Sequence, residues 1–274
     1  MLRRLAFCCF ALFSLFCSPP AEEAPVHLPV LMYHEVKREH TGKDVITPEE
    51  LRSDLEWLRA EGYAAVTMQE VVSFVLEGAP LPEKPVVLSF DDGLFSALGT
   101  VLPLLREAEM PMVLSVIGLS ADEVSSFPQG PTYAHATWDQ LRELTESGLV
   151  EVQNHSYDLH RTDRGAVGVL RRPGEGLRAY EARLSGDALL LQERVFQETG
   201  CLPNTFTYPY GAYDALSESV LRELGFRATL TCDFGMNLLD RDPDCLFGMK
   251  RICRAHGADL AALLAEAENT LKWR

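Results

Sequence analysis

The chain has 274 residues, of which 47% are hydrophobic and 24% are charged, a composition typical of globular proteins. This length suits one barrel-sized α/β domain or two small domains. The formal net charge of −15 argues against nucleic acids and anionic membranes as partners, and it is compatible with neutral or cationic substrates.

The N-terminus is typical of a secretory signal. Two arginines, Arg3 and Arg4, precede an apolar run from Leu5 to Cys17, and Ser-Pro-Pro-Ala follows. We expect residues 1–21 to be a signal peptide or an N-terminal anchor, with lipidation of Cys17 as a further alternative. The run is too short for a comfortable membrane span, so membrane contact is expected only through this segment. The protein is therefore predicted to be secreted or associated with the cell envelope, with residues 22–274 forming a single domain.

Four cysteines lie outside the signal, and all of them fall in the last quarter of the chain. No two of them form a C-x-x-C pair, which argues against a zinc knuckle. In an exported protein they could form one or two local disulfides, whose pairing the spacing does not reveal.

Apolar strand patterns alternate with amphipathic helix patterns along the whole chain. Strands are predicted at 30–34, 64–67, 86–90, 112–117, 149–153, 205–208, 228–231 and 249–253, and helices at 47–62, 69–77, 94–108, 137–148, 177–198, 215–224 and 258–271. Residues 121–136 and the arginine-rich residues 161–176 are predicted to be loops, the second of them mobile. The alternation predicts a parallel sheet with crossover helices, in a single barrel-like α/β domain. The active site of such a domain lies at the C-terminal ends of its strands.

An acidic pair follows the most apolar strand. Val86 to Phe90 is typical of a fully buried strand, and Asp91 and Asp92 come directly after it. Unpaired buried carboxylates are too costly for core residues, and two adjacent carboxylates need a counter-charge such as a metal ion. The alternative is one aspartate that caps the next helix and one that faces solvent.

Two histidines follow another predicted strand. His155 and His160 are five residues apart, about 140° around a helix, so they can converge only across a strand end and the following turn. Histidine and carboxylate are ordinary ligands of Zn²⁺ and similar divalent ions, and Co²⁺ or Ni²⁺ would also fit. Two histidines and one aspartate leave a coordination position open for water, and the other aspartate is then free to act as general base. The alternative is a pair of loop histidines and a solvated acidic pair.

These motifs resemble the polysaccharide deacetylases of carbohydrate esterase family 4. Ser89-Phe90-Asp91-Asp92-Gly93 is similar to the first family motif, His155 to His160 to the second, and Tyr208-Pro209-Tyr210-Gly211 to the core of the third. The resemblance covers residues 28 to 274 and implies a distorted (β/α) barrel that removes acetyl groups from sugars with the help of a metal ion. It implies that Asp91 is the general base and that Asp92, His155 and His160 hold the metal. It also implies that the backbone N–H of Tyr210 stabilises the oxyanion.

The sequence departs from the family pattern at two places. Thr207 stands where the third motif usually begins with an arginine that orients the base, and the usual C-terminal Leu-x-His has no clean match. Pro29 to His34, with the third motif, resembles the branch of poly-β-1,6-N-acetylglucosamine deacetylases, in which the early histidine reaches the site. His34 is therefore either a proton-transfer or orienting group, or a strand-end histidine bonded to backbone. Arg251 either replaces the missing arginine or pairs with a surface acid.

We therefore expect an exported, metal-dependent hydrolase that removes acetyl groups from an N-acetylated glycan, namely a polymer of N-acetylglucosamine. One alternative is an acetylxylan-type O-deacetylase, and another is a non-catalytic glycan-binding module on the same fold. A glycosidase fits poorly, because its two acids flank the scissile bond and need no histidine pair.

Overall fold

The computed structural model describes residues 25–38, 42–127 and 135–273. The expected signal segment, residues 1–21, lies outside this part of the chain. Within it, every helix is too short or too polar to span a membrane.

The main sheet is parallel throughout. Its strands follow the order β12–β11–β8–β7–β6–β2–β14, and β5 pairs with β6 outside this path. Every neighbouring pair in this sheet is parallel. The strands are β2 (Val30–Tyr33), β5 (Ala64–Ala65), β6 (Pro85–Phe90), β7 (Met112–Val116), β8 (Val150–Asn154), β11 (Thr205–Thr207), β12 (Ala228–Leu230) and β14 (Ile252–Cys253).

The two ends of this sheet approach each other. A parallel bridge joins Leu230 of β12 to Met249, which leads into β14. The backbone N–H of Thr231 donates to Met249 over 2.9 Å, and that of Met249 donates to Thr229 over 2.9 Å. The sheet thus curves into the distorted barrel that the sequence predicts.

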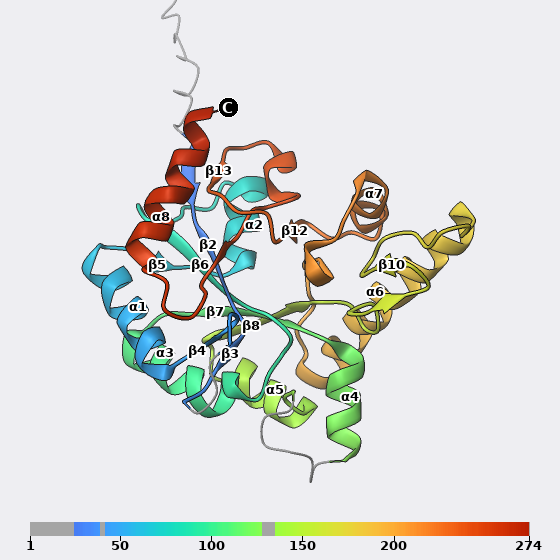
Figure 1. Ribbon diagram of the computed structural model, residues 1–274, viewed down its shortest axis with the longest axis horizontal. Coiled ribbons are helices and arrows are strands. Elements are labelled where there is room, and N and C mark those ends of the chain that lie inside the picture. Colours follow the sequence, from blue (N-terminus) through green and yellow to red (C-terminus); the bar gives the residue numbers. More distant parts are fainter. Residues whose placement is uncertain (1–24, 39–41, 128–134, 274) are drawn as a thin grey trace, which may run out of the picture.

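Three short strand pairs lie outside the main sheet. They are β1 (Val26–Leu28) with β13 (Asn237–Leu239), β3 (Glu35–Val36) with β4 (Val45–Ile46), and β9 (Thr162–Asp163) with β10 (Ala166–Val167). The β9–β10 hairpin projects beside α6 at one side of the molecule (Figure 1).

Helices cover the outside of the barrel (Figure 1). They are α1 (Pro48–Ala60), α2 (Met68–Glu77), α3 (Leu102–Ala108), α4 (Gly118–Ser126), α5 (Trp138–Glu146), α6 (Leu177–Thr199), α7 (Ala215–Glu223) and α8 (Leu260–Asn269). Threonines 47, 67 and 137 begin α1, α2 and α5 with capping boxes, in which the hydroxyl accepts the N3 amide and the N3 side chain accepts the cap amide. A π-helical turn (Ala97–Val101) precedes α3, and 3-10 turns lie at Pro209–Gly211, Pro243–Leu246 and Thr270–Trp273.

The core explains why the first acidic motif sits where it does. All six residues of β6 are buried, because β2 and β7 flank the strand and side chains pack on both of its faces. The apolar run therefore carries the chain through the barrel and delivers Asp91 and Asp92 to its C-terminal edge.

Two expectations about loops were wrong in part. The segment 121–136 is not all loop, because α4 covers Gly118 to Ser126. That helix is held by tertiary contacts that local composition does not reveal: the amides of Gly118 and Leu119 donate to the carbonyls of Ser156 and Tyr157. The arginine-rich segment 161–176 contains the β9–β10 hairpin. Arg172, which follows this hairpin, forms an ion pair with Asp163 of β9. The four cysteines outside the signal are free thiols, so no disulfide links them.

Candidate active site

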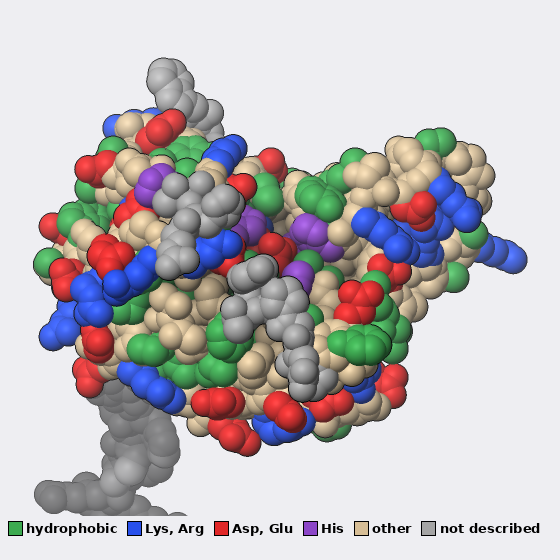
Figure 2. All heavy atoms as spheres, turned by 60° about the horizontal axis from the view of Figure 1, so that its bottom comes forward, with side chains coloured by type: hydrophobic (Ala, Val, Ile, Leu, Met, Phe, Trp, Pro, Cys, Tyr) green, Lys and Arg blue, Asp and Glu red, His purple; other side chains and the backbone are tan. Residues whose placement is uncertain are grey.

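The residues singled out in the sequence gather at one end of the barrel. Asp91 and Asp92 follow β6, and His155 follows β8. His34 follows β2, and Tyr210 lies in the turn after β11. Because the C-terminal ends of parallel strands meet at one edge, four separate segments reach the same place. Figure 2 shows several histidine side chains near the centre of one face, with acidic side chains between them.

Asp92, His155 and His160 form a compact set of potential metal ligands. The Nε2 atoms of both histidines lie 3.5 Å from Asp92 Oδ1, and one ligand atom from each residue lies within 4.8 Å of the others. Asp92 Oδ1 is buried and has no hydrogen-bond partner among the described residues. A buried carboxylate oxygen without a partner is costly unless a cation satisfies it. The donors also fit, because one carboxylate and two imidazoles make a common catalytic zinc set with an open position.

A hydrogen bond at Nδ1 sets the orientation of the His155 ring. Its Nδ1 lies 2.8 Å from the carbonyl oxygen of Thr207, and the side chain is buried. A carbonyl only accepts, so Nδ1 carries the proton of this bond and the neutral ring turns the Nε2 lone pair toward Asp92. This is the arrangement that a metal-binding histidine needs.

The electrostatics of the set favour positive charge. Burial opposes ionisation of Asp92, but the imidazoles of His155 and His160 beside it outweigh burial and lower the pKa of Asp92. Burial also lowers the pKa of His155, yet the adjacent carboxylates of Asp92 and Asp91 outweigh burial and raise this pKa. Burial and the charge of His155 lower the pKa of His160. Asp92 is thus kept as a carboxylate next to the two imidazoles, and a carboxylate with neutral imidazoles is the donor set that a divalent cation takes.

His160 is held by Tyr210. The Tyr210 hydroxyl donates to the His160 carbonyl over 3.2 Å, and the two ring centroids lie 4.4 Å apart.

The backbone of the site is unusual at three residues. The φ values are 71° at Asp92, 71° at Ser156 and 59° at Tyr210, in the left-handed region that non-glycine residues rarely adopt. Such backbone costs of order 1–3 kcal/mol per residue and clusters at functional sites.

Asp91 faces a different partner. Arg251 donates from Nη1 and Nη2 to its two carboxylate oxygens over 2.7 and 2.8 Å, and both side chains are buried. Burial raises the pKa of Asp91, but the charge of Arg251 outweighs burial and holds this pKa below its usual value. The same guanidinium donates to Ser89 Oγ over 3.1 Å. Ser89 and Asp91 lie two residues apart, so they face the same side.

Three further positions from the sequence prediction are His34, Thr207 and Arg251. His34 Nε2 lies 3.9 Å from Asp91 Oδ2, and 27% of the His34 side chain is exposed. Thr207 shares a 2.7 Å hydrogen bond with Ser115 and is buried, so its side chain does not contact Asp91. Of the two interpretations of Arg251, the pairing with Asp91 is the one the structure contains.

Two further residues at the site were missed in the sequence. Cys232 follows β12, and its Sγ lies 3.7 Å from Arg251 Nη2. Its position after a predicted strand was an available signal. His135 forms an isolated bridge with Leu94, next to the first motif, and its pKa is lowered by burial and raised by Asp92, with burial dominant. No local pattern in the sequence marks His135, because its approach to Asp92 joins residues far apart in the chain.

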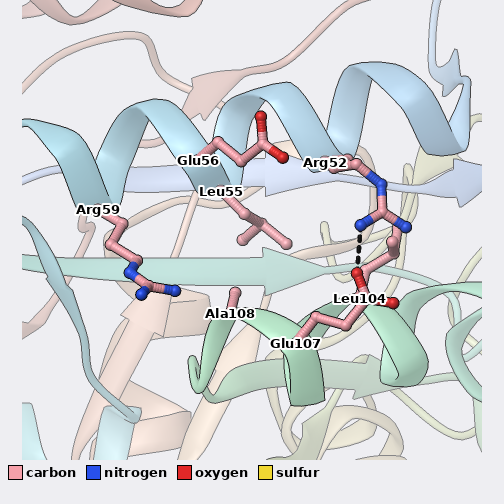
Figure 3. A pocket seen from close by; sticks show the side chains of 7 residues that line it. All are labelled: Arg52, Leu55, Glu56, Arg59, Leu104, Glu107 and Ala108. Carbon is pink, nitrogen blue, oxygen red and sulfur yellow. Dashed lines mark hydrogen bonds and ion pairs between the residues drawn. The ribbon is translucent and has the colours of Figure 1, made fainter.

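A separate cavity lies outside the barrel, between α1 and α3 (Figure 3). It measures about 170 Å³, and an ion pair between Arg52 and Glu107 crosses one side of it. The cavity contains none of the residues of the site at the strand ends.

Comparison with known proteins agrees with this geometry. The family model described as polysaccharide deacetylase matches residues 78–229. Poly-beta-1,6-N-acetyl-D-glucosamine N-deacetylase of Escherichia coli strain K12 is 30% identical over 205 residues, which cover 68% of this chain and 30% of that protein. The chain therefore matches less than a third of the length of this relative.

Solved structures match over more of their length. The BpsB deacetylase domain from Bordetella bronchiseptica has a TM-score of 0.70 at 27% identity, covering 87% of this chain and 98% of that one. A de-N-acetylase from Aggregatibacter actinomycetemcomitans has a TM-score of 0.71 at 25% identity, covering 82% and 94%. Motifs, fold and family match coincide on the same residues, and the chain belongs to the polysaccharide deacetylase family.

Proposed function

We propose that this protein is a metal-dependent hydrolase that removes acetyl groups from an N-acetylated polysaccharide, of the poly-β-1,6-N-acetylglucosamine type. The observation that carries the proposal is the contrast between two adjacent carboxylates. Asp92 Oδ1 is buried, has no hydrogen-bond partner within the described part of the chain and faces two imidazole nitrogens, whereas Asp91 is bound by Arg251. The names of the relatives support the substrate class.

Asp92, His155 and His160 would hold the metal ion, for which the donor set favours Zn²⁺, with Co²⁺ or Ni²⁺ as alternatives. Such an ion, when bound, lowers the pKa of a water molecule and polarises the acetyl carbonyl. Thr207 supports this role, because its carbonyl fixes the His155 tautomer with Nε2 free to bind.

Asp91 would take the proton of the attacking water as general base. Arg251 keeps this carboxylate ionised by its charge and fixes its direction with two hydrogen bonds. Breaking a buried ion pair by removing one partner costs about 3–5 kcal/mol, so Asp91 is held firmly in this position. Arg251 would thus perform the orienting task of the arginine that Thr207 replaces.

His34 and Tyr210 would complete the reaction. The His34 imidazole would give a proton to the leaving amine, and its 3.9 Å distance from Asp91 and its partial exposure support this role. The backbone N–H of Tyr210 would donate to the oxyanion, and the contacts of Tyr210 with His160 support its fixed position.

The experiment is an acetate-release assay on the metal-loaded protein, with and without a chelator. We expect acetate from β-1,6-linked N-acetylglucosamine oligomers, loss of release with chelator, and recovery when Zn²⁺ is restored. Chitin oligomers and acetylxylan run in parallel test the linkage and the O-deacetylase alternative. Release that persists in a chelated Asp92→Ala protein would contradict the proposed mechanism. Binding of the glycan without acetate release, with metal supplied, would favour the glycan-binding alternative.

The apolar N-terminal segment supports a further part of the proposal. The protein would act outside the cytoplasm, secreted or associated with the cell envelope, with the signal peptide or anchor in residues 1–21. Cell fractionation, with detection of the mature N-terminus by mass spectrometry, tests this location. A protein that retains residues 1–21 in the soluble cytoplasmic fraction would contradict it.

A further inference from the structure

The segment between the two histidines of the site has no regular structure of its own. His155 directly follows β8, and the residues from there to His160 contain only bends and irregular backbone before the β9–β10 hairpin. Ser156 adopts a left-handed conformation with φ 71°, which local propensity does not favour. Contacts from elsewhere in the fold must therefore fix the position of His160 relative to His155.

One carboxylate makes two of these contacts. Oδ1 of Asp187, on α6, accepts the backbone N–H of Tyr157 over 2.8 Å. Oδ2 of the same side chain accepts the backbone N–H of Asp158 over 2.7 Å. Asp187 thus accepts hydrogen bonds from two consecutive amides midway between His155 and His160. Hydrogen bonds from neutral amides to a carboxylate are roughly twice as strong as bonds between neutral groups.

Neighbouring contacts tie α6 to the same segment. Asn154 donates from Nδ2 to the carbonyl of Ala188 over 3.0 Å, and its Oδ1 accepts the Ser156 amide over 2.9 Å. The residue before His155 is therefore linked to the residue after Asp187. α6 approaches both sides of the first histidine.

A second anchor lies about two turns further along the helix. Arg194 of α6 donates to Asp122 Oδ1 over 2.5 Å, and the Tyr157 hydroxyl donates to Asp122 Oδ2 over 2.8 Å. The Tyr157 side chain and α6 thus share a carboxylate on α4. α6 cannot slide along the segment without breaking these bonds.

The partly buried position of Asp187 disfavours the charged form of its carboxylate. Burial raises its pKa to about 6, although the bonds from the Asp158 and Tyr157 amides act in the opposite direction. A carboxylate that served only as a surface group would not be placed where desolvation penalises its charge. Its ionised form offers two acceptors, and the two amides need both.

We propose that Asp187 is a positioning residue of the metal site. By accepting hydrogen bonds from the Tyr157 and Asp158 amides, it sets the separation of His155 and His160. Asp187 touches neither the metal nor the substrate in this role, and its effect passes through the backbone between the two histidines. This inference rests on the proposed function, because it assigns Asp187 to the metal site of that function.

The test compares Asp187→Asn with the full-length wild-type protein. An asparagine side chain is nearly isosteric, but it has one acceptor oxygen, and its NH₂ group faces a backbone donor. We expect the Zn²⁺ dissociation constant, measured by competition with a chromophoric chelator, to rise on the order of 10–100-fold, as is typical when a residue supporting a metal ligand is lost. The visible spectrum of the Co²⁺ form should change as well. Amide hydrogen exchange should accelerate in peptides covering residues 155–160, with far-UV circular dichroism unchanged.

The matched control is Glu193→Gln, an exposed carboxylate on the same helix that contacts only Gln197 among the described hydrogen bonds. It should leave Zn²⁺ affinity and exchange at 155–160 unchanged. If Asp187→Asn binds Zn²⁺ as tightly as wild type, the positioning role of Asp187 is overturned while the proposed function stands. If wild type binds Zn²⁺ no better than Asp92→Asn, the proposed metal site itself fails. Should Asp187→Asn not fold, rapid exchange of the Tyr157 and Asp158 amides in wild type would overturn the inference.

Discussion

Two adjacent aspartates have opposite surroundings at this site. The negative charge of Asp91 is balanced by the bidentate contact with Arg251. Asp92 Oδ1, by contrast, has no hydrogen-bond partner among the described residues. The left-handed φ of 71° at Asp92 turns the backbone between them, and Gly93 continues the turn with φ 68°. The two carboxylates can therefore perform different tasks although they are neighbours in sequence.

This contrast predicts different effects of the same substitution at the two positions. Asp91→Asn should lower kcat about 10²- to 10⁴-fold, the usual contribution of a general base, while Zn²⁺ affinity changes little. Asp92→Asn should lose Zn²⁺ binding and acetate release together, because it removes the one carboxylate of the set. The measurements are acetate release and chelator competition on both variants.

Each variant serves as the other's control, since both exchange an aspartate for asparagine at adjacent positions. Equal loss of Zn²⁺ binding in the two proteins would show that Asp91 is also a ligand. That result would contradict the division of tasks.

At the scale of single residues, sequence predicts the site where the signal is local. Asp91, Asp92, His155 and His160 each lie directly after a strand or in its following turn, so strand periodicity alone brings them together. The contact of Arg251 with Asp91 joins residues 160 positions apart. It depends on where β14 enters the barrel, which no local pattern encodes, and so two interpretations of Arg251 remained open until the fold was known.

Helix α4 shows the same limit at the scale of an element. Its sequence is rich in serine and small residues, and only Gly118 and Ala121 of its nine residues are buried. A helix with so little apolar surface is defined by its contacts: its first amides bond to the segment that carries the histidines. Strongly patterned helices with threonine capping boxes, such as α1 and α5, were predictable because their signals are local.

The start of α4 predicts a site-directed effect. A Cβ added at Gly118 would lie 2.5 Å from Tyr157 Cδ2 and 3.3 Å from Tyr157 Cα. The ring cannot easily retreat, because its hydroxyl is bonded to Asp122. Gly118→Ala should therefore cost about 1–3 kcal/mol of unfolding free energy through overpacking and should weaken Zn²⁺ binding. Urea unfolding and chelator competition measure the two effects.

Gly186 provides the matched control, because it lies in α6 next to Asp187, and an added Cβ there would meet no atom of the other described elements within 4 Å. Gly186→Ala should stabilise the protein by about 0.5–1 kcal/mol, since alanine is a better helix former. If both substitutions had the same effect on stability, steric contact at Tyr157 could not be the cause.

The capping box of α1 predicts a pH dependence. Glu50 accepts the amides of Thr47 and Gly257 over 2.8 and 2.7 Å, and it contacts His256 Nδ1 over 2.8 Å. Burial acts to raise its pKa, but these bonds outweigh burial and lower the pKa to about 2. Stabilisation from such a carboxylate is present above the unfolded-state pKa and is lost as pH falls through the folded-state value.

Glu50→Gln should therefore lower the unfolding free energy by about 1–2 kcal/mol at pH 7. The deficit relative to wild type should shrink as pH falls from about 4.5 toward 2, since protonation removes the same charge from wild type. Urea unfolding at pH 7, 4.5 and 3 measures this. Glu49→Gln, at an exposed position in the same turn, should show little deficit, and a deficit for Glu50→Gln that grows toward acid pH would contradict the assignment.

At the scale of the whole molecule, the barrel brings together residues from almost the entire chain. The site draws on His34 near the start of the described residues and on Arg251 near their end. Alternation of strands and helices was sufficient to predict the parallel sheet. The barrel itself was predicted through the family resemblance, whereas its closure between Leu230 and Met249 has no apolar pattern of its own, because it consists of backbone contacts.

A site assembled from distant segments couples ligand binding to global stability. The proposed metal set joins the end of β6 to the segment after β8, and its geometry exists only when the barrel is folded. A ligand that binds only the folded state adds RT ln(1 + [L]/Kd), about 2.7 kcal/mol at 100 Kd. For a chain of this size each kcal/mol raises Tm by about 2–4 °C. Saturating Zn²⁺ should therefore raise the wild-type Tm by about 5–10 °C.

The measurement is differential scanning calorimetry of the chelated protein at several Zn²⁺ concentrations. His160→Ala should abolish the shift, because the His160 side chain is partly exposed and its loss removes a donor while leaving the buried core intact. Replacing His256, a loop histidine paired with Glu50, should leave the Zn²⁺-dependent shift as in wild type. A similar shift in wild type and His160→Ala would place the stabilising ion elsewhere on this acidic protein, since only binding at the strand ends requires both histidines of the second motif.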